Sequence, residues 1–159
     1  MSTAPNLTLV SEVLPVIRRD FALASPGLLD PMNNNPLLDG EWMQLDSSYK
    51  LARGANEQVP NAFQVFAERG RYDTQAAQKT TVLYMGYYEA ETSICDVTGA
   101  AVGDKLMVVD VSIGGVNKRA LKKVSGNGQH MIFGHVTRLV GTTKLRYICH
   151  AGWPIQITI

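Results

Sequence analysis

The sequence predicts an all-β fold, a small β-barrel or sandwich, with an extended, proline-rich N-terminal arm before it. Three observations predict this arrangement. Short segments rich in aromatic and β-branched residues follow one another after residue 60, with turn residues between them. Few segments have helical periodicity. Five of the seven prolines lie in the first 36 residues, whereas twelve of the fourteen glycines lie at or after Gly54. The chain therefore changes character near residues 50–60.

Length and composition indicate one domain with a surface suited to protein contact. A chain of 159 residues, 45% of them hydrophobic, is long enough to build a core without metals or disulfides. Fifteen Lys and Arg residues against 14 Asp and Glu give a net charge of +1, which creates no global field for nucleic acid or anionic lipid. Charged residues make up 18% of the chain, below the roughly 25% of ordinary domains. This low value favours some exterior surface that meets another protein.

Residues 1–55 are expected to form the arm. Apolar residues between positions 7 and 17 recur at helical spacing, but Pro15 interrupts the pattern, so at most a short helix precedes it. Residues 25–40 are apolar pairs separated by Pro, Asn and Asp, and each residue before a proline favours extended backbone. We expect this segment to lie on another surface, its own or a neighbour's.

Residues 56–159 are expected to form the β-domain and to fold without the arm. Residues 143–151 alternate most clearly, with Leu145, Tyr147 and Cys149 on one face. Asn-Gly within residues 125–128 predicts a hairpin, because such pairs supply the positive φ angles of tight turns. The expected strands are at residues 61–68, 80–88, 91–97, 105–111, 121–124, 130–140, 143–151 and 155–159.

Histidines and cysteines give no sign of chemistry. His130 and His135 are five residues apart in an expected strand and so lie on opposite faces, whereas a metal pair on a strand needs a spacing of two. The first residues lack the basic and apolar regions of a signal peptide, so we expect synthesis in the cytoplasm. Cys95 and Cys149 are then reduced, and their apolar neighbours indicate buried, unreactive thiols. We expect no metal and no cofactor.

Two groups of charged residues have both a functional and a structural interpretation. Acidic residues surround Trp42 at positions 39, 41 and 46, without the spacing of a calcium loop; a solvated turn beside an anchoring tryptophan is favoured. The run Lys118-Arg119-Ala-Leu-Lys122-Lys123 offers phosphate contacts, but no aromatic residue is interleaved with it, which favours a solvated hairpin face.

Four segments resemble virion structural proteins of tailed bacteriophages, and most of all the capsid decoration, or cement, proteins. They are NNNPLLDGEWMQLDSSYKLARGA (residues 33–55), FAERGRYDTQ (66–75), VGDKLMVVDV (102–111) and FGHVTRLVG (133–141). The resemblance covers most of the chain from residue 33, and its motifs are not enzymatic. It implies an arm joined to a small β-barrel or sandwich that binds the outside of the major capsid protein shell.

The expected function is therefore a non-catalytic virion protein that decorates and stabilises a phage capsid, assembled in the host cytoplasm and carried on the capsid exterior. Its expected partners are the major capsid protein lattice and copies of itself, as a homotrimer or a dimer, with no membrane and no direct nucleic-acid contact. The alternatives are a small β-barrel binding module for nucleic acid or glycan, and a phage tail or baseplate subunit. The residues expected at interfaces are Leu28, Leu29, Leu37, Leu38, Trp42, Ile155, Ile157 and Ile159.

Overall fold

The computed structural model describes residues 6–54, 62–66, 78–152 and 154–159, apart from the side chain of Val13. Strands hold 61% of the described residues and helix 3%, so the prediction of an all-β fold is confirmed. The elements are β1 (Leu7–Ala22), η1 (Pro26–Leu29), β2 (Trp42–Leu45), β3 (Leu51–Ala52), β4 (Ala62–Val65), β5 (Lys79–Thr92), β6 (Cys95–Asp96), β7 (Lys105–Ile113), β8 (Val116–Lys123), β9 (Gln129–Ile132), β10 (Gly134–Val140), β11 (Lys144–Ala151) and β12 (Ile155–Thr158).

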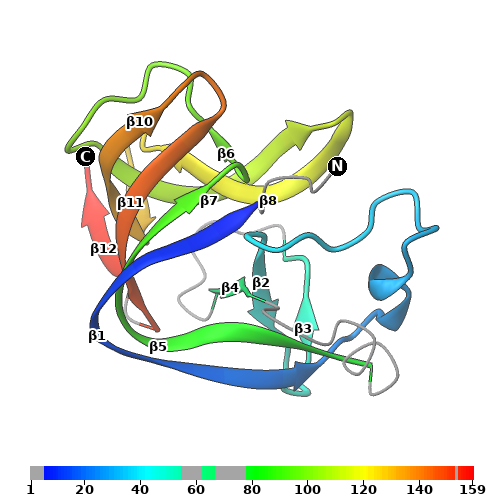
Figure 1. Ribbon diagram of the computed structural model, residues 1–159. Coiled ribbons are helices and arrows are strands. Elements are labelled where there is room, and N and C mark those ends of the chain that lie inside the picture. Colours follow the sequence, from blue (N-terminus) through cyan, green and yellow to red (C-terminus); the bar gives the residue numbers. More distant parts are fainter. Residues whose placement is uncertain (1–5, 55–61, 67–77, 153) are drawn as a thin grey trace.

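One large sheet organises the described residues. Its strand order is β3-β2-β4-β5-β11-β10-β7-β8-β6, with β1 also paired to β5, and β12 and β9 form a separate two-stranded sheet. Figure 1 shows β1 and β5 as a long bent pair that connects β2, β3 and β4 at one end of the molecule to β7, β8, β10 and β11 at the other. The bent pair therefore holds the two halves of the fold together.

The expected arm is part of this sheet, which corrects the sequence-based view of residues 1–55. β1 pairs antiparallel with β5 from Leu7 opposite Thr92 to Ala22 opposite Lys79, so no helix precedes Pro15. The residues in this stretch are apolar at irregular intervals because the pairing register shifts at several points. Bulges of this kind break the two-residue period that identifies a strand.

Pro15 marks the bend of β1. It lies between Leu14 and Ile17, where the register with β5 shifts, and a bulge accommodates a residue that has no N–H to donate. Gly86 faces the bend with a φ of 131°. A Cβ at position 86 would lie 2.8 Å from the carbonyl oxygen of Pro15. The close approach of β1 to β5 at this point therefore requires glycine at position 86.

Both parts of the chain contribute to the interior. One apolar cluster includes Tyr88, Leu121, Tyr147 and, from the expected arm, Trp42. A second cluster is built mostly from the first 65 residues and also holds Val82 of β5. The expected boundary between residues 55 and 56 falls outside the described residues, but the strands before and after it belong to the same sheet. The early segment is a structural part of the fold.

Most of the later strands lie close to their expected positions. The strand expected at 130–140 is divided into β9 and β10, and β5 covers the strand expected at 80–88 and the start of the one expected at 91–97. The expected hairpin at residues 125–128 is wrong. β8 and β9 flank that turn, yet β8 pairs with β7 and β6, while β9 pairs with β12. The tight hairpin lies instead at Gly114 and Gly115, with φ values of 62° and 82° between the paired residues Ile113 and Val116. A two-residue turn whose central residues both have positive φ angles matches the right-handed twist of the two strands that it joins.

Candidate interaction surface

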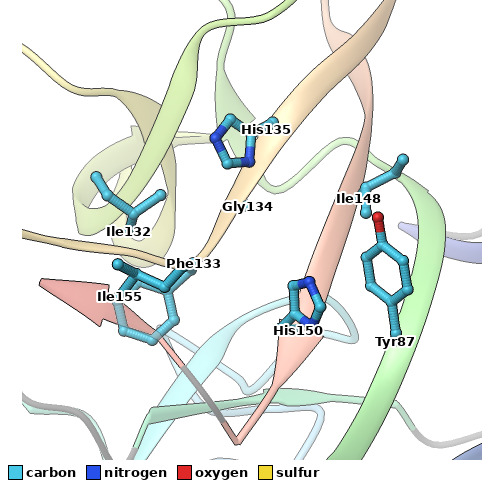
Figure 2. Close-up of a pocket in the computed structure, with 8 residues that line it drawn as sticks. All are labelled: Tyr87, Ile132, Phe133, Gly134, His135, Ile148, His150 and Ile155. Atoms are coloured by element: carbon cyan, nitrogen blue, oxygen red, sulfur yellow. The ribbon is translucent and has the colours of Figure 1, made fainter. Parts of the chain in front are cut away.

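An apolar hollow lies where β5, β11 and β10 approach β9 and β12 (Figure 2). It has a volume of about 190 Å³. The sheet register explains its composition, because residues that pair across strands share a face. The paired positions that line it are Tyr87 with His150, His135 with Ile148, and Ile132 with Ile155, and Phe133 and Gly134 complete the lining.

Gly134 permits the close approach of two strands at this hollow. A Cβ at position 134 would lie 2.4 Å from the carbonyl oxygen of Ile148, so a larger residue would push β10 away from β11. Beside it the rings of Tyr87 and His150 are stacked, with centroids 4.1 Å apart and planes 10° apart. The hollow thus lies where two strands approach closely, and stacked aromatic rings form one of its walls.

A second, smaller hollow of about 130 Å³ continues the first along β12. The two share Ile132, His135 and Ile155, and the second adds Lys105 and Ile157. We call the two hollows together the β12 groove. The ionisable side chains that line it are Lys105, His135 and His150 together with the phenol of Tyr87, and none of the described lining residues is a carboxylate. The groove is apolar, and Lys105 supplies a positive charge at its rim.

β12 forms one wall of this groove and leaves much of its apolar surface in water. Ile155 is 58% exposed and Ile159 is 56% exposed, and Ile157 lies half-buried between them. The strand pairs with β9 on one side, and no other described strand pairs with it. Of the residues expected at an interface, Ile155 and Ile159 are the exposed ones.

Three of the other expected interface residues are buried within their own chain. Leu29, Leu37 and Trp42 are 5%, 1% and 2% exposed, and the Trp42 ring packs edge-on against Phe133 with centroids 5.0 Å apart. These three offer no surface to a neighbour, because the pocket expected from another subunit is supplied by β-strands of the same chain. Leu28 and Leu38 are half-buried.

A buried ionic cluster replaces the solvated turn expected around Trp42. Glu41 is fully buried, and its Oε1 lies 2.8 Å from Nζ of Lys118, whose side chain is 2% exposed. Arg53 adds a second cation, with Nε 3.0 Å from Oε2 of Glu41, and donates to the carbonyl oxygens of Asn35 and Pro36. Lys118 also donates to the carbonyl of Pro36. We call Glu41, Arg53 and Lys118 the ionic cluster; it fastens the loop before β2 to β8.

All four cations of the basic run form ion pairs. The expectation of a solvated hairpin face is wrong for Lys118 and Arg119, which are buried, whereas the side chains of Lys122 and Lys123 are 40% and 39% exposed. Each cation sits 2.8–3.3 Å from a carboxylate oxygen, so the run lacks the open charge that phosphate contacts need. The pairs are Lys118 with Glu41, Arg119 with Asp110, Lys122 with Asp96, and Lys123 with Asp104.

A second buried polar cluster lies in the larger core. Oε1 of Gln64 accepts hydrogen bonds from the hydroxyls of Tyr88, at 2.9 Å, and Tyr147. Its Nε2 donates to the carbonyl of Gly40 at 3.1 Å. Burial raises the pKa of both tyrosines well above the ordinary value, so both remain neutral donors. Fully satisfied buried networks of this kind specify one packing of a core.

The cysteines match their sequence-based interpretation, whereas the histidines do not. Cys95 and Cys149 are free and buried, and burial raises the pKa of each thiol to about 12. His130 is buried in β9, whereas His135 is exposed in β10. The single strand expected to carry both is therefore two strands in two different sheets, and the expectation of opposite faces of one strand is wrong. Among the described residues, no group of three or more His, Cys, Asp or Glu side chains is arranged to hold a metal ion.

Sequence reasoning missed both the β12 groove and the ionic cluster. Each combines residues far apart in the chain: Tyr87 with Ile155 in the groove, and Glu41 with Lys118 in the cluster. One available signal was the alternation of His150 with buried residues of β11, which places its ring on the outer face. The sequence did not predict which strands pair with each other in the sheet, because strand order is set by packing between distant segments.

Comparisons with known proteins give no relative for this chain. No family model matches it, and neither a curated protein nor a solved structure matches it. Among the described residues, no helix has the length and apolar character needed to cross a membrane.

Proposed function

We propose that this chain is a non-catalytic structural protein of a tailed-phage virion, which decorates the outside of the capsid and stabilises it by binding the major capsid protein lattice. One observation carries the proposal. β1 holds three exposed large apolar side chains, Val10, Leu14 and Ile17, at 40%, 58% and 54% exposure. Apolar groups gathered on one strand favour a protein-binding surface over scattered exposure.

The position of β1 supports this reading. It runs for 16 residues and pairs with β5 along one side; on the other side the described residues supply only a bridge from Leu23, just past its end, to Leu51. A lattice protein can meet such a strand through side chains and through the remaining backbone groups. Pro15 and the bulges limit uncontrolled pairing of the edge, so contact through the exposed side chains is the expected mode.

A sedimentation experiment tests the proposal. Capsids assembled from the major capsid protein of the source phage, prepared without this chain, are mixed with the purified protein and centrifuged through a gradient. We expect co-sedimentation at micromolar concentration, electron-microscopic density on the capsid exterior, and a higher temperature of capsid disruption. Absence of the protein from the capsid fraction would overturn the proposal.

A surface variant locates the contact. Burial of one exposed leucine contributes roughly 1.5–3 kcal/mol, so Leu14→Asp is expected to weaken capsid binding by about 10- to 100-fold. Val102→Ser is the matched control, because Val102 is 68% exposed and lies on a loop away from β1. Equal binding by the two variants would exclude β1 as the contact.

A binding module for a nucleic acid or a glycan is the second candidate, favoured by the stacked Tyr87 and His150 beside the groove. Flat aromatic surfaces stack on bases and sugars. The ion-paired basic run argues against the nucleic acid. Titration with oligonucleotides and with a glycan array distinguishes this candidate, and the same sedimentation with purified tails and baseplates tests a tail or baseplate subunit.

A further inference from the structure

The loop between η1 and β2 presents an exposed apolar side chain beside a carboxylate. Met32 is 87% exposed, the highest value among the large hydrophobic residues that the structure describes. Asp30, two residues earlier, is also exposed, and its Oδ1 accepts the backbone N–H of Met32 at 2.9 Å. An acidic group therefore accompanies the methionine at a fixed separation.

Hydrogen bonds hold this loop in one shape. Asn33 donates from Nδ2 to the carbonyl of Gly27 at 3.0 Å, and Asn35 donates from Nδ2 to the carbonyl of Asn117 at 3.0 Å. The N–H of Leu37 donates to the carbonyl of Leu28 at 2.8 Å. An ordered loop loses little conformational entropy on binding, so a methionine at its surface is a ready contact residue.

The β12 groove has the complementary chemistry. Its floor is apolar, and its rim holds Lys105, His135 and His150 with no carboxylate among the described lining residues. Its larger hollow of about 190 Å³ exceeds the roughly 150 Å³ of a cavity that accepts benzene, and it is therefore large enough for the end of a methionine side chain. A nearby Asp would meet Lys105 at the rim.

The loop and the groove cannot meet within one molecule. In Figure 1 the loop that follows η1 lies at the right of the molecule, and β10, β11 and β12 lie at the left. A contact between them must therefore join two copies, with the loop of one copy in the groove of the next. In a linear assembly built by such head-to-tail contacts, the loop of one end copy and the groove of the other end copy stay unoccupied. A contact between these two ends closes a ring.

We propose that a second copy of this chain occupies the β12 groove, with Met32 of one copy in the apolar hollow of the next and Asp30 against Lys105 at its rim. The inference deepens the proposed function, and rests on it, by naming a contact between copies. The complementary charges favour this occupant. A standard stable interface needs roughly 800 Å² per partner, about a tenth of the 8415 Å² that the chain exposes. The contact of one loop with one groove buries less surface than this. We therefore expect micromolar association, which becomes stronger where a ring closes.

Light scattering after size exclusion, in the absence of capsids, tests the contact on the full chain. We expect the mass to rise above that of the monomer between micromolar and several hundred micromolar. Met32→Ser and Ile155→Asp should each weaken association at least tenfold, while Val102→Ser should not change it. A monomer at every concentration, or equal effects of all three variants, would overturn the proposal whatever the result with capsids.

A mixing experiment tests the head-to-tail geometry. Met32→Ser keeps its groove and Ile155→Asp keeps its loop, so an equimolar mixture restores one contact per pair. We expect dimers and no larger species from the mixture. Lys105→Glu provides a second groove variant that leaves the apolar residues intact, and it should behave like Ile155→Asp. A mixture that remains monomeric, although each variant melts like the original protein, would exclude this geometry.

Discussion

Neutralising Glu41 is expected to destabilise the protein severely. Glu41→Gln keeps the shape of the side chain but removes the charge that faces Lys118 at 2.8 Å and Arg53 at 3.0 Å. Arg53 is 19% exposed in its side chain and retains some hydration, whereas Lys118, at 2%, does not. Removing one partner of a buried pair costs about 3–5 kcal/mol, because the other charge stays buried without compensation.

The measurement is urea and thermal unfolding at pH 7. For a chain of this size each kcal/mol lowers the Tm by roughly 2–4 °C, so the expected loss is about 6–20 °C. Glu12→Gln is the matched control: Glu12 forms an ion pair with Arg18 at 3.0 Å, but both side chains are about one third exposed. Exposed pairs contribute roughly 0–1 kcal/mol.

A double variant tests the cause. Glu41→Gln combined with Lys118→Met removes both buried charges and should be more stable than Glu41→Gln by itself. If Glu41→Gln lowered stability no more than the Glu12→Gln control, or if the two substitutions simply added, the ionic cluster would not be a coupled buried pair and the reasoning would fail.

Four further predictions concern the fold. A fragment of residues 56–159 lacks β1, β2 and much of the second apolar cluster, and should show no cooperative melting by circular dichroism. Cys95 and Cys149, with pKa values of about 12, should resist thiol reagents at pH 8 until the protein is unfolded, as mass spectrometry would reveal. Gly86→Ala places a Cβ 2.8 Å from backbone atoms of β1 at a φ of 131°, and should lower the Tm by several degrees; an unchanged Tm would mean that β1 shifts freely. Hydrogen bonds from the side chain and backbone of Thr98, with the charge of Lys122, lower the pKa of Asp96 below its ordinary value. The contribution of the Asp96 carboxylate to the free energy of unfolding is therefore present above the unfolded-state pKa and is lost as the pH falls through the folded-state pKa. Asp96→Asn should destabilise the protein at pH 7 and make no difference near about pH 2.

The fold class was predictable from the sequence because strand alternation is a local property. In β11 every second residue, Leu145, Tyr147 and Cys149, is fully buried as the pattern indicates. The same local reasoning correctly predicted buried thiols, but it placed His130 and His135 in one strand, whereas they lie in β9 and β10 of two different sheets. It failed for β1, because register shifts break the two-residue period there and Pro15 suggested an end to regular structure.

Tertiary structure decided which surfaces remain exposed. Trp42 looked like an anchor for a neighbour, but Phe133 packs against it within the same chain. Glu41 and Lys118 looked solvated, but strand pairing buries them together although 76 residues separate them in the sequence. The short-range pattern around Ile155, Ile157 and Ile159 indicated an apolar strand, and only the position of β12 beside β9 left its outer side unpaired among the described strands. Sequence patterns record which residues prefer burial, whereas the partner that buries them is set by packing between distant segments.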